Sequence, residues 1–430
     1  MQEAKPFQID KRIIFEAFKK VKSNGGSPGI DGIEMSAYEQ NLGSNFYRLW
    51  NRMSSGSYMP KAVKLVEILK SNGGKRPLGI PSVEDRIAQM AVVNVIEPLV
   101  EPYFHKDSFG YRPHRSAHDA IAKAERRCWK YAWVLDIDIS KFFDTIDHGL
   151  LMKAVEKHIK TKWILLYIKR WLTVPYQGND GAIVKRHMGV PQGSVIGPIL
   201  ANQFLHYTFD KWMSYKYPHV PFERYADDCV CHCGTLAQAE YIKDRLGERF
   251  AECKLTFNEE KTKIVFCKTS NRSSEHYHCT SFDYLGFTFR PRAAKDKRKN
   301  VLFTSYLPAI SNKSESRIHE TIKSWNLKRL HNRSLRFVAA YINDVVRGWI
   351  SYYGKFGKTE FWKVMCHLNR SIAYWAKTKY KRLRRRGVIS AHYWLAYIAQ
   401  KEPNLFYHWQ VGYIPYACLL YTSPSPRDCS

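Results

Sequence analysis

The stretch RYADDCVCHC (residues 224–233) decides the fold of this 430-residue chain. Residues 229–233 have the composition and alternation of a β-strand, and two adjacent carboxylates, Asp227 and Asp228, stand at its start. Like charges this close repel each other, so the pair does not favour stability. A divalent cation bound between the two carboxylates would make their proximity favourable. The alternative is a solvated turn rich in acids, and the short motif does not exclude it.

A second acidic strand is predicted 89 residues before Asp227 (227 minus 138), in the sequence WVLDIDI (133–139). Its apolar residues share one face, whereas Asp136 and Asp138 share the other. The plain alternative is an edge strand with its acids in water. Between the two acidic sites lies GVPQGS (189–194), which taken alone predicts an ordinary Pro/Gly turn. The three signals in this order are hard to assign to chance.

This order of segments resembles the palm of a reverse transcriptase, and the wider match is to reverse transcriptases encoded by bacterial group II introns. The resemblance reaches to about residue 415 and is carried by SPGIDG (27–32), GGKRPLGIPSVEDRIAQ (73–89), DSFGYRPHRSAHDAI (107–121), VLDIDISKFFDTIDH (134–148), MGVPQGSVIGPILAN (188–202), RYADDCV (224–230), LTFNEEKTKIV (255–265), FDYLGFTFRPR (282–292) and RGWISYYGKF (347–356). One departure is Gly197, where relatives usually have Ser before the proline. It leaves the local geometry open but touches no expected metal ligand.

The resemblance implies an α+β fold, a right-hand polymerase. Its fingers and palm would combine a mixed sheet with helices, and an α-helical thumb would follow. The expected divisions are fingers (1–105), palm (106–290), thumb or maturase domain X (291–370), a basic aromatic segment that binds RNA or DNA (371–417) and a non-native tail (418–430). The tail is expected because LLYTSPSPRDCS resembles translated sequencing-adapter text.

Local patterns add detail to this organisation. Helices are predicted over residues 13–21 and 88–100, with loops at 24–29 and 71–74, and the charged run PRAAKDKRKN (291–300) is the expected junction between palm and thumb. In the thumb, apolar residues spaced three and four apart predict one buried helix face. They are Leu335, Val338, Ala339, Ile342, Val345, Val346, Trp349 and Tyr353.

Nucleotidyl transfer by such a palm needs two Mg²⁺ ions, for which Mn²⁺ is an expected substitute. Mg²⁺ uses one or two carboxylates together with substrate phosphates and water. The resemblance assigns Asp138 and Asp227 as bridging ligands and Asp228 as a ligand of the primer-side metal. The backbone carbonyl of Ile139 is a further expected ligand.

The remaining expected contacts also come from the resemblance. Lys64, Lys70 and Arg86 would hold the triphosphate, and Lys261 would lie near the leaving pyrophosphate. Gln192 would line the sugar pocket, and Phe142, four residues after Asp138, would stack under the ribose and exclude a 2′-hydroxyl. Each of these has a plain alternative, since the cations could be surface charges and Phe142 a core aromatic. The primer grip would be the hairpin FDYLGFTF (282–289), including Phe282, Tyr284, Leu285 and Gly286.

The charge of the chain is unevenly distributed. Its net charge is +29, of which residues 291–430 carry +19 (26 Lys+Arg, 7 Asp+Glu) and residues 1–290 carry +10 (42 and 32). Cations neutralise phosphates and aromatic rings stack on bases, so the C-terminal third is expected to bind a polyanion. The densest run, KTKYKRLRRR (377–386), favours RNA contact over a solvated face. The residues expected to touch RNA are Lys381, Arg382, Arg384, Arg385 and Arg386.

The ten cysteines form no C-x-x-C pairs, and Cys229, Cys231 and Cys233 are expected to be small buried thiols rather than metal ligands. The polar N-terminus and the lack of a long apolar run predict no signal peptide and no membrane partner. We therefore expect a cytoplasmic protein, in a bacterial ribonucleoprotein.

The leading interpretation is an RNA-directed DNA polymerase that copies its intron RNA and assists its splicing as a maturase. Its partners would be the intron RNA, a DNA primer or target DNA, and deoxynucleoside triphosphates. One alternative keeps the polymerase in a host-adopted role, in CRISPR adaptation or phage defence. Another is a non-catalytic RNA-binding splicing factor, which the intact Asp138, Asp227 and Asp228 argue against. An RNA-directed RNA polymerase is disfavoured because those enzymes usually carry Gly where this chain has Ala226.

Overall fold

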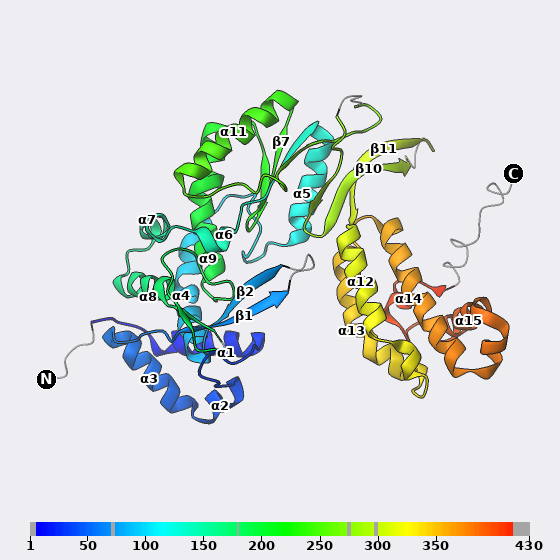
Figure 1. Cartoon of the computed structure of the whole chain (residues 1–430), viewed down its shortest axis with the longest axis horizontal. Coiled ribbons are helices and arrows are strands. Elements are labelled where there is room, and N and C mark those ends of the chain that lie inside the picture. Colours follow the sequence, from blue (N-terminus) through cyan, green and yellow to red (C-terminus); the bar gives the residue numbers. More distant parts are fainter. Residues whose placement is uncertain (1–5, 70–73, 179, 273–276, 296–299, 416–430) are drawn as a thin grey trace. The chain divides into compact units, whose positions relative to one another are not determined.

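The computed structural model describes residues 6–69, 74–178, 180–272, 277–295 and 300–415. The chain forms two compact units (Figure 1). Met1–Ala120 and Trp133–Ile264 make the first unit, and Ile121–Ala132 and Val265–Ser430 make the second. Within the described ranges, none of the helices has the length and apolar composition that a membrane crossing requires.

The helices of the first unit confirm both helices predicted in the fingers. They are α1 (Lys11–Asn24), α2 (Met35–Gln40), α3 (Leu42–Ser55), α4 (Val83–Val100), η1 (Glu101–Tyr103), α6 (Phe142–Thr145), α7 (His148–His158), α8 (Lys162–Thr173), α9 (Gly197–Leu205), η2 (His206–Asp210), α10 (Lys211–Lys216) and α11 (Leu236–Glu252). Helices α1 and α4 begin before the predicted residues because the side chains of Asp10 and Ser82 accept hydrogen bonds from their first turns. The chain leaves α1 for a loop at Gly25, as predicted, whereas 71–73 of the second predicted loop lie outside the described residues.

The acidic strands belong to a four-stranded sheet of order β6-β7-β3-β8. Its strands are β3 (Trp133–Ile137), β6 (Phe222–Tyr225), β7 (Asp228–Cys233) and β8 (Lys263–Phe266). Strand β7 is antiparallel to both β6 and β3. Helix α11 contacts β3 and β7, and Cys229, Cys231 and Cys233 are buried in the same core as its apolar residues (Figure 1). The three thiols are therefore core residues, as predicted.

A second sheet of the first unit has the order β2-β1-β4-β5. Its strands are β1 (Val63–Leu69), β2 (Lys75–Ile80), β4 (Tyr176–Gln177) and β5 (Ile183–Val184). Strands β1 and β2 form an antiparallel hairpin in which Lys64 pairs with Ile80.

The second unit contains a three-stranded antiparallel sheet of order β11-β10-β9. Its strands are β9 (Phe282–Tyr284), β10 (Phe287–Lys295) and β11 (Leu302–Ile310). The expected junction at 291–300 is corrected here. Residues 291–295 continue β10 and pair with β11, while 296–299 lie outside the described residues. Charged side chains can alternate along an exposed strand as well as fill a linker, and composition does not distinguish the two.

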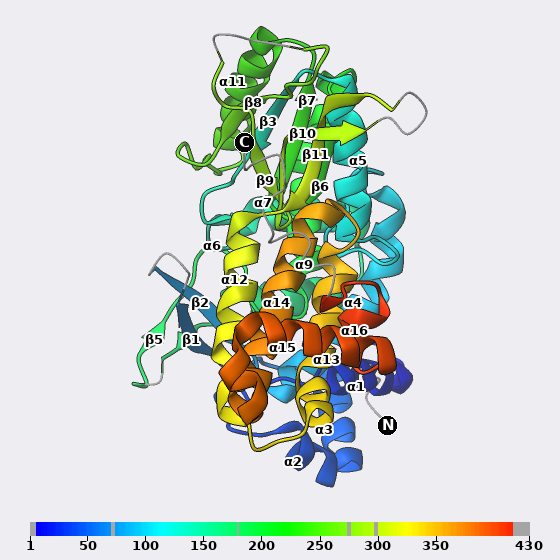
Figure 2. The ribbon, with the colours of Figure 1, turned by 90° about the vertical axis from the view of Figure 1, so that its right-hand side faces the viewer.

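Apart from the end of β8, the remaining regular structure of the second unit within the described residues is helical. Its helices are α5 (Ala117–Lys130, which begins in the first unit), α12 (Asn312–Ser324), η3 (Leu327–Leu330), α13 (Leu335–Tyr353), α14 (Lys358–Lys379), α15 (Lys381–Lys401) and α16 (Tyr407–Gln410). Helices α12, α13 and α14 run side by side, and α15 crosses them (Figures 1 and 2). The predicted apolar face of α13 is largely confirmed, with Val338, Ala339, Ile342 and Val346 buried. Val345 is an exception, with 42% of its surface exposed.

Candidate active site

The register of β3 against β7 brings the two acidic sites together. The pairs run from Trp133↔Cys233 to Ile137↔Cys229. Continuing that register by one residue sets Asp138 opposite Asp228, and opposite residues of an antiparallel pair lie on the same face with Cβ atoms about 4.5–5.5 Å apart. Leu135 and Ile137 are buried, as predicted, and the two aspartates of the strand lie on its other face.

The carboxylates of Asp227 and Asp228 are presented by a tight hairpin turn. Tyr225 pairs with Asp228, which leaves Ala226 and Asp227 as the two turn residues. Ala226 has a φ of 57°, the left-handed conformation required at the first position of a type II′ turn. The turn leaves Asp227 half-buried and Asp228 exposed at the end of β7.

The three carboxylates interact electrostatically. Part of the Asp228 side chain is exposed to solvent, but the protein atoms packed around its carboxylate exclude much of the water that would solvate the charge. This desolvation, reinforced by the charges of Asp227 and Asp138, raises the pKa of Asp228 to about 7, whereas Lys261 acts in the opposite direction. Nζ of Lys261 lies 3.4 Å from Oδ2 of Asp138, so the structure brings this predicted cation to the carboxylates. The site therefore concentrates negative charge that one lysine offsets only in part.

The backbone beyond β3 is held by the segment before β8. The carbonyl of Asp138 accepts a hydrogen bond from the Asn258 N–H (2.8 Å), and the Ser140 N–H donates to the Thr256 carbonyl (2.9 Å). Carbonyls of successive extended residues point to opposite sides. The carbonyl of Ile139 therefore points away from this segment, toward the β7 side of the strand.

The three carboxylates suit Mg²⁺ better than a metal whose ligands all come from protein side chains. Within the described ranges, no group of three or more His, Cys, Asp or Glu side chains is arranged to hold a metal ion unaided. Mg²⁺ does not require such a cage, because it retains waters and takes ligands from substrate phosphates. Hard carboxylate oxygens gathered at one strand end, with unbalanced negative charge, fit that ion.

The predicted sugar gate is corrected by the burial of Phe142. Its ring is 2% exposed, belongs to the core and contacts the rings of Phe143 and Phe204. A gate must touch the sugar, and a ring enclosed this way cannot. Phe143, the neighbouring ring, is only partly buried. Because Phe142 and Phe143 are adjacent and identical, the sequence does not show which ring lies in the core and which is accessible.

The segment Gly189–Gln192 lies against α6, which contains Phe143 and Asp144. The Val190 N–H donates to the Phe143 carbonyl (2.7 Å), and a side chain at Gly189 would collide with the backbone of Asp144. Nε2 of Gln192 lies 3.4 Å from both carboxylate oxygens of Asp144. Gln192 therefore contacts Asp144, the residue that follows Phe143 in the chain, and its place in a sugar pocket stays a prediction.

The three predicted triphosphate contacts have different outcomes. Lys64 lies on β1 opposite Ile80, and the adjacent Gly79 N–H donates to the Gln192 carbonyl (2.7 Å), so this hairpin contacts the segment that carries Gln192, and triphosphate contact by Lys64 stays a prediction. Lys70 lies outside the described residues. Arg86 is buried, and its guanidinium donates to the carbonyls of Gly25 (3.2 Å) and Ser27 (2.9 Å). This placement contradicts direct triphosphate contact by Arg86, which instead fixes the loop after α1.

The predicted primer grip is a hairpin in the second unit. Leu285 and Gly286 join β9 to β10, and both have positive φ (52° and 79°), as a type I′ turn requires. Rings of Phe282 and Phe289 stack 4.8 Å apart beneath it. The Leu285 carbonyl accepts from the Tyr352 hydroxyl (2.9 Å), which fixes the turn to α13. Its contact with a primer stays a prediction.

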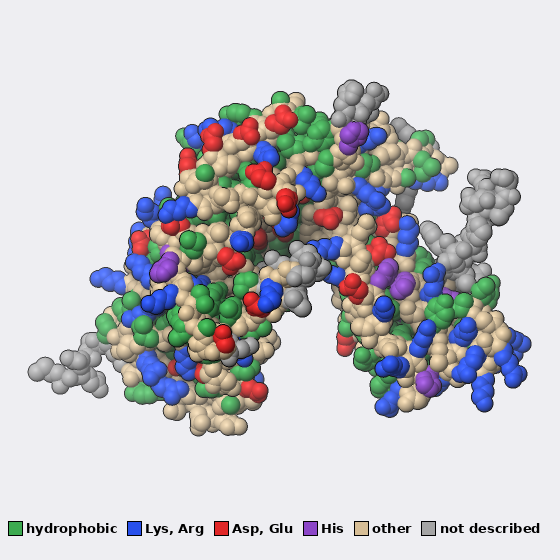
Figure 3. Space-filling view, viewed as in Figure 1, with side chains coloured by type: hydrophobic (Ala, Val, Ile, Leu, Met, Phe, Trp, Pro, Cys, Tyr) green, Lys and Arg blue, Asp and Glu red, His purple; other side chains and the backbone are tan. Residues whose placement is uncertain are grey.

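The basic run (377–386) covers the end of α14 and the first part of α15, and the five residues expected to touch RNA lie in α15. Figure 3 shows Lys and Arg side chains gathered around this helix. The five residues expected to touch RNA are all exposed, and Leu383 between them is buried as their anchor. Gly387, with a φ of 86°, kinks the helix directly after the run. The residues are therefore accessible to a polyanion, although Arg384 also donates to the Thr378 carbonyl (2.8 Å), and RNA contact stays a prediction.

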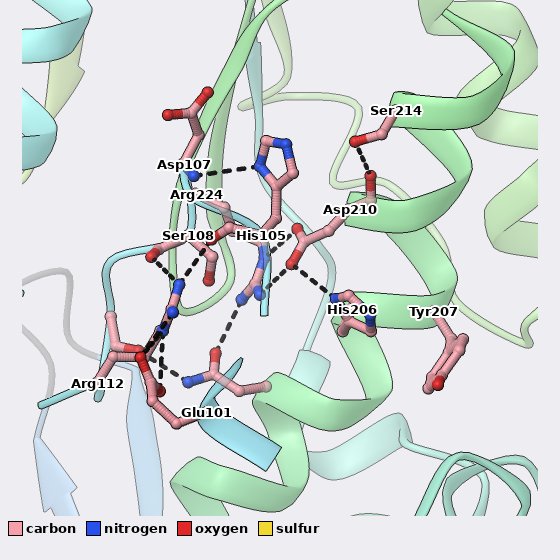
Figure 4. Close-up of polar contacts among 12 residues, drawn as sticks. Glu101, His105, Asp107, Ser108, Arg112, His206, Tyr207, Asp210, Ser214 and Arg224 are labelled. Carbon is pink, nitrogen blue, oxygen red and sulfur yellow. Dashed lines mark hydrogen bonds and ion pairs between the residues drawn. The ribbon is translucent and has the colours of Figure 1, made fainter. Parts of the chain in front are cut away.

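The sequence predicts no role for the residues behind the Ala226–Asp227 turn. Arg224 and Asp210 form an ion pair with no exposed side-chain surface (Figure 4). Two adjacent charged residues, Glu223 and Arg224, in a short strand directly before the acidic turn are the signal that could have revealed Arg224, but nothing in the sequence marks Asp210 as its partner.

Comparison with known proteins assigns the family. Residues 68–289 match the family described as reverse transcriptase (RNA-dependent DNA polymerase), and residues 316–394 match the group II intron maturase-specific domain. Among solved structures, a telomerase from Candida albicans in complex with a fragment of telomeric RNA has a TM-score of 0.46 at 13% identity, over 86% of this chain and 70% of that one.

Curated relatives include proteins named for introns. Protein YkfC of Escherichia coli (strain K12) is 35% identical over 58% of this chain and 76% of its own length. The group II intron-encoded protein LtrA of Lactococcus lactis subsp. cremoris is 30% identical over 59% of this chain, and the putative COX1/OXI3 intron 2 protein of Saccharomyces cerevisiae is 29% identical over 62%. The chain spans only 42% and 29% of the lengths of these two proteins. From the matched regions, this chain belongs to the reverse transcriptase family and carries the group II intron maturase-specific domain.

Proposed function

We propose that this reverse transcriptase copies RNA into DNA with two Mg²⁺ ions held by Asp138, Asp227 and Asp228, and that its maturase domain assists the splicing of a group II intron RNA. The observation that carries the proposal is the β3–β7 register. It sets Asp138 opposite Asp228 and next to a turn that presents Asp227.

The metal ions, when bound, would supply activation of the attacking 3′-hydroxyl and neutralisation of the leaving pyrophosphate. Asp138 and Asp227 would bridge the two sites, with Asp228 on the primer side and the Ile139 carbonyl as a further oxygen. Lys261 would balance charge where pyrophosphate leaves, since its ammonium already pairs with Asp138. These residues hold the reacting groups in place, and the chemistry requires little more from the protein.

The nucleotide pocket would be bordered by Lys64 on the fingers hairpin, by Gln192 and by Phe143. Lys64 pairs with Ile80, and the neighbouring Gly79 is the residue whose N–H contacts Gln192. This position supports a role for Lys64 on the triphosphate. Phe143 replaces Phe142 as the proposed gate because it is only partly buried and because Gln192 contacts Asp144, the residue next to it. The sheet hairpin at Leu285 and Gly286 would grip a DNA primer, and α15 would bind intron RNA. A ribonucleoprotein in a bacterial cytoplasm is the proposed setting.

The proposal requires RNA-templated DNA synthesis that depends on a divalent metal. Full-length protein should extend a DNA primer on an RNA template with deoxynucleotides. EDTA should abolish extension, excess Mg²⁺ should restore it, and Mn²⁺ should substitute. Gel analysis of extended primers measures this. Extension that persists at saturating EDTA, or none with either metal on any template, would contradict the proposal.

The gate assignment predicts opposite behaviour of two adjacent phenylalanines. Phe143→Val should raise ribonucleotide incorporation relative to deoxynucleotide by about tenfold or more, because the smaller side chain leaves room for a 2′-hydroxyl. Phe142→Ala should instead lower the free energy of unfolding by roughly 3–5 kcal/mol, as core truncations do, with little change in sugar choice. The ratio of kcat/KM values for the two nucleotides and a denaturant titration provide the measurements. A changed ratio for Phe142→Ala alone would return the gate to Phe142.

A further inference from the structure

A buried ion pair lies behind the turn that presents Asp227. Arg224, on β6, donates from Nε and Nη2 to the two carboxylate oxygens of Asp210, each at 2.6 Å, and neither side chain has exposed surface (Figure 4). Asp210 is the last residue of η2, a π-helical turn between α9 and α10. Such turns are rare and recur at functional sites. Nearby His206 has its pKa lowered to about 4, chiefly by burial, so it is neutral and leaves the Asp210 charge to Arg224.

The third guanidinium nitrogen of Arg224 reaches the catalytic turn itself. Nη1 donates to the Ala226 carbonyl (3.0 Å) and to Oδ1 of Asn202 (2.9 Å). Nδ2 of Asn202 in turn donates to the Gly110 carbonyl (2.8 Å). Gly110 lies so close to the turn that a Cβ atom there would be 2.3 Å from the Ala226 nitrogen. The turn is therefore held from one side by Arg224 and from another by Gly110.

The turn needs such support because its conformation is not one that alanine prefers. A left-handed φ costs an L-residue roughly 1–2 kcal/mol. The Ala226 carbonyl belongs to the peptide group that leads into Asp227, so a hydrogen bond to that carbonyl fixes the direction in which the Asp227 side chain leaves the backbone. An apolar pair could fill the space of Arg224 and Asp210 with equal or better stability. It could not donate to Ala226.

We infer that Arg224, oriented by Asp210 and Asn202, is a positioning residue that sets the Asp227 carboxylate for metal binding. The inference rests on the proposed function. Arg224 touches no reacting atom, and it acts through the Ala226–Asp227 peptide group.

Arg224→Lys tests this role. Lysine keeps the positive charge for Asp210, but its single ammonium cannot copy the fork that reaches the carboxylate, Asn202 and Ala226 together. Outer partners of metal ligands typically contribute 10–100-fold to affinity or activity. We expect kcat to fall by about that factor and the Mg²⁺ half-saturation to rise, with a smaller change in KM for deoxynucleotide. Mn²⁺ binding to a complex on a dideoxy-terminated primer, followed by electron paramagnetic resonance, should weaken by about tenfold without any turnover.

Glu223→Gln is the matched control. It alters another buried pair on the same strand, in which Oε2 of Glu223 lies 2.6 Å from Nε2 of His232. This variant should lower Tm but keep the Mn²⁺ affinity of the wild type. If Arg224→Lys does not fold, Asn202→Ala, which keeps the ion pair, should weaken Mn²⁺ binding in the same direction. Folded Arg224→Lys with wild-type kcat and Mn²⁺ affinity overturns the inference. An inactive wild type would instead contradict the proposed polymerase.

Discussion

Asp227→Ala should abolish DNA synthesis on an RNA template, with kcat reduced by about a thousandfold or more. In its proposed role Asp227 bridges two metal ions, so its loss would remove charge stabilisation worth several kcal/mol, and each 1.36 kcal/mol is a factor of ten in rate. The fold should not suffer, because the turn closes through backbone pairing of Tyr225 with Asp228. Removing one charge from a repelling cluster should leave Tm unchanged or higher when no divalent cation is present. Single-turnover primer extension and a thermal melt measure both effects.

Asp136→Asn provides the control for this loss. Asp136 lies on the same face of β3 as Asp138, two residues earlier, and the substitution removes one charge without changing shape. It should keep activity within a few-fold of the wild type, and RNA binding should persist in both variants. Asp227→Ala that extends primers with Mg²⁺ at a rate near that of the wild type would refute its assignment as a ligand.

Replacing the five exposed cations of α15 with glutamine should weaken intron RNA binding and reduce its salt dependence. The slope of log K against log[salt] should flatten by roughly 0.7–0.9 for every phosphate that the protein no longer neutralises, so the change should reach several units if all five residues touch phosphates. Polymerisation on a short primer–template should suffer less, since the carboxylates are unaltered. The quintuple variant carries K381Q, R382Q, R384Q, R385Q and R386Q. Filter-binding titrations over a salt series measure the slope.

The control is a second quintuple variant, which removes the same number of positive charges from another surface. In it, five exposed lysines of α7, α8 and the segment between them are changed to glutamine. They are Lys153, Lys157, Lys160, Lys162 and Lys169. This control should change the slope much less than the α15 variant. Equal effects of the two variants, or no effect of the α15 variant, would mean that the run on α15 is a solvated face.

The sequence predicted the parts of the site that depend on strand periodicity. Alternation along residues 133–139 gave the faces of β3, and the turn motif gave the position of Asp227, because a period of two determines which side chains share a face. The register that sets Asp138 opposite Asp228 could be seen only in the structure. Pairing partners distant in the chain leave no local pattern.

The errors arose where burial decides the role of a residue. Phe142 and Phe143 are adjacent and chemically identical, so only the packing of α6 shows which ring is enclosed. Arg86 is predicted to hold the triphosphate, but it is buried against two carbonyls of the loop after α1. Asp210 is separated from Arg224 by 14 residues (224 minus 210), and a π-helical turn determines where it points. Each outcome depends on tertiary contacts that composition and spacing do not encode.

The most direct test of the metal site is a crystal structure with Mn²⁺, an RNA template, a dideoxy-terminated DNA primer and the next deoxynucleotide. Anomalous scattering locates Mn²⁺ independently of the protein. The assignment predicts two Mn²⁺ ions, with carboxylate oxygens of Asp138 and Asp227 bound to both and Asp228 on the primer side. The assignment would be contradicted if the nucleotide were bound in the palm while Mn²⁺ lay elsewhere or did not contact Asp138 and Asp227.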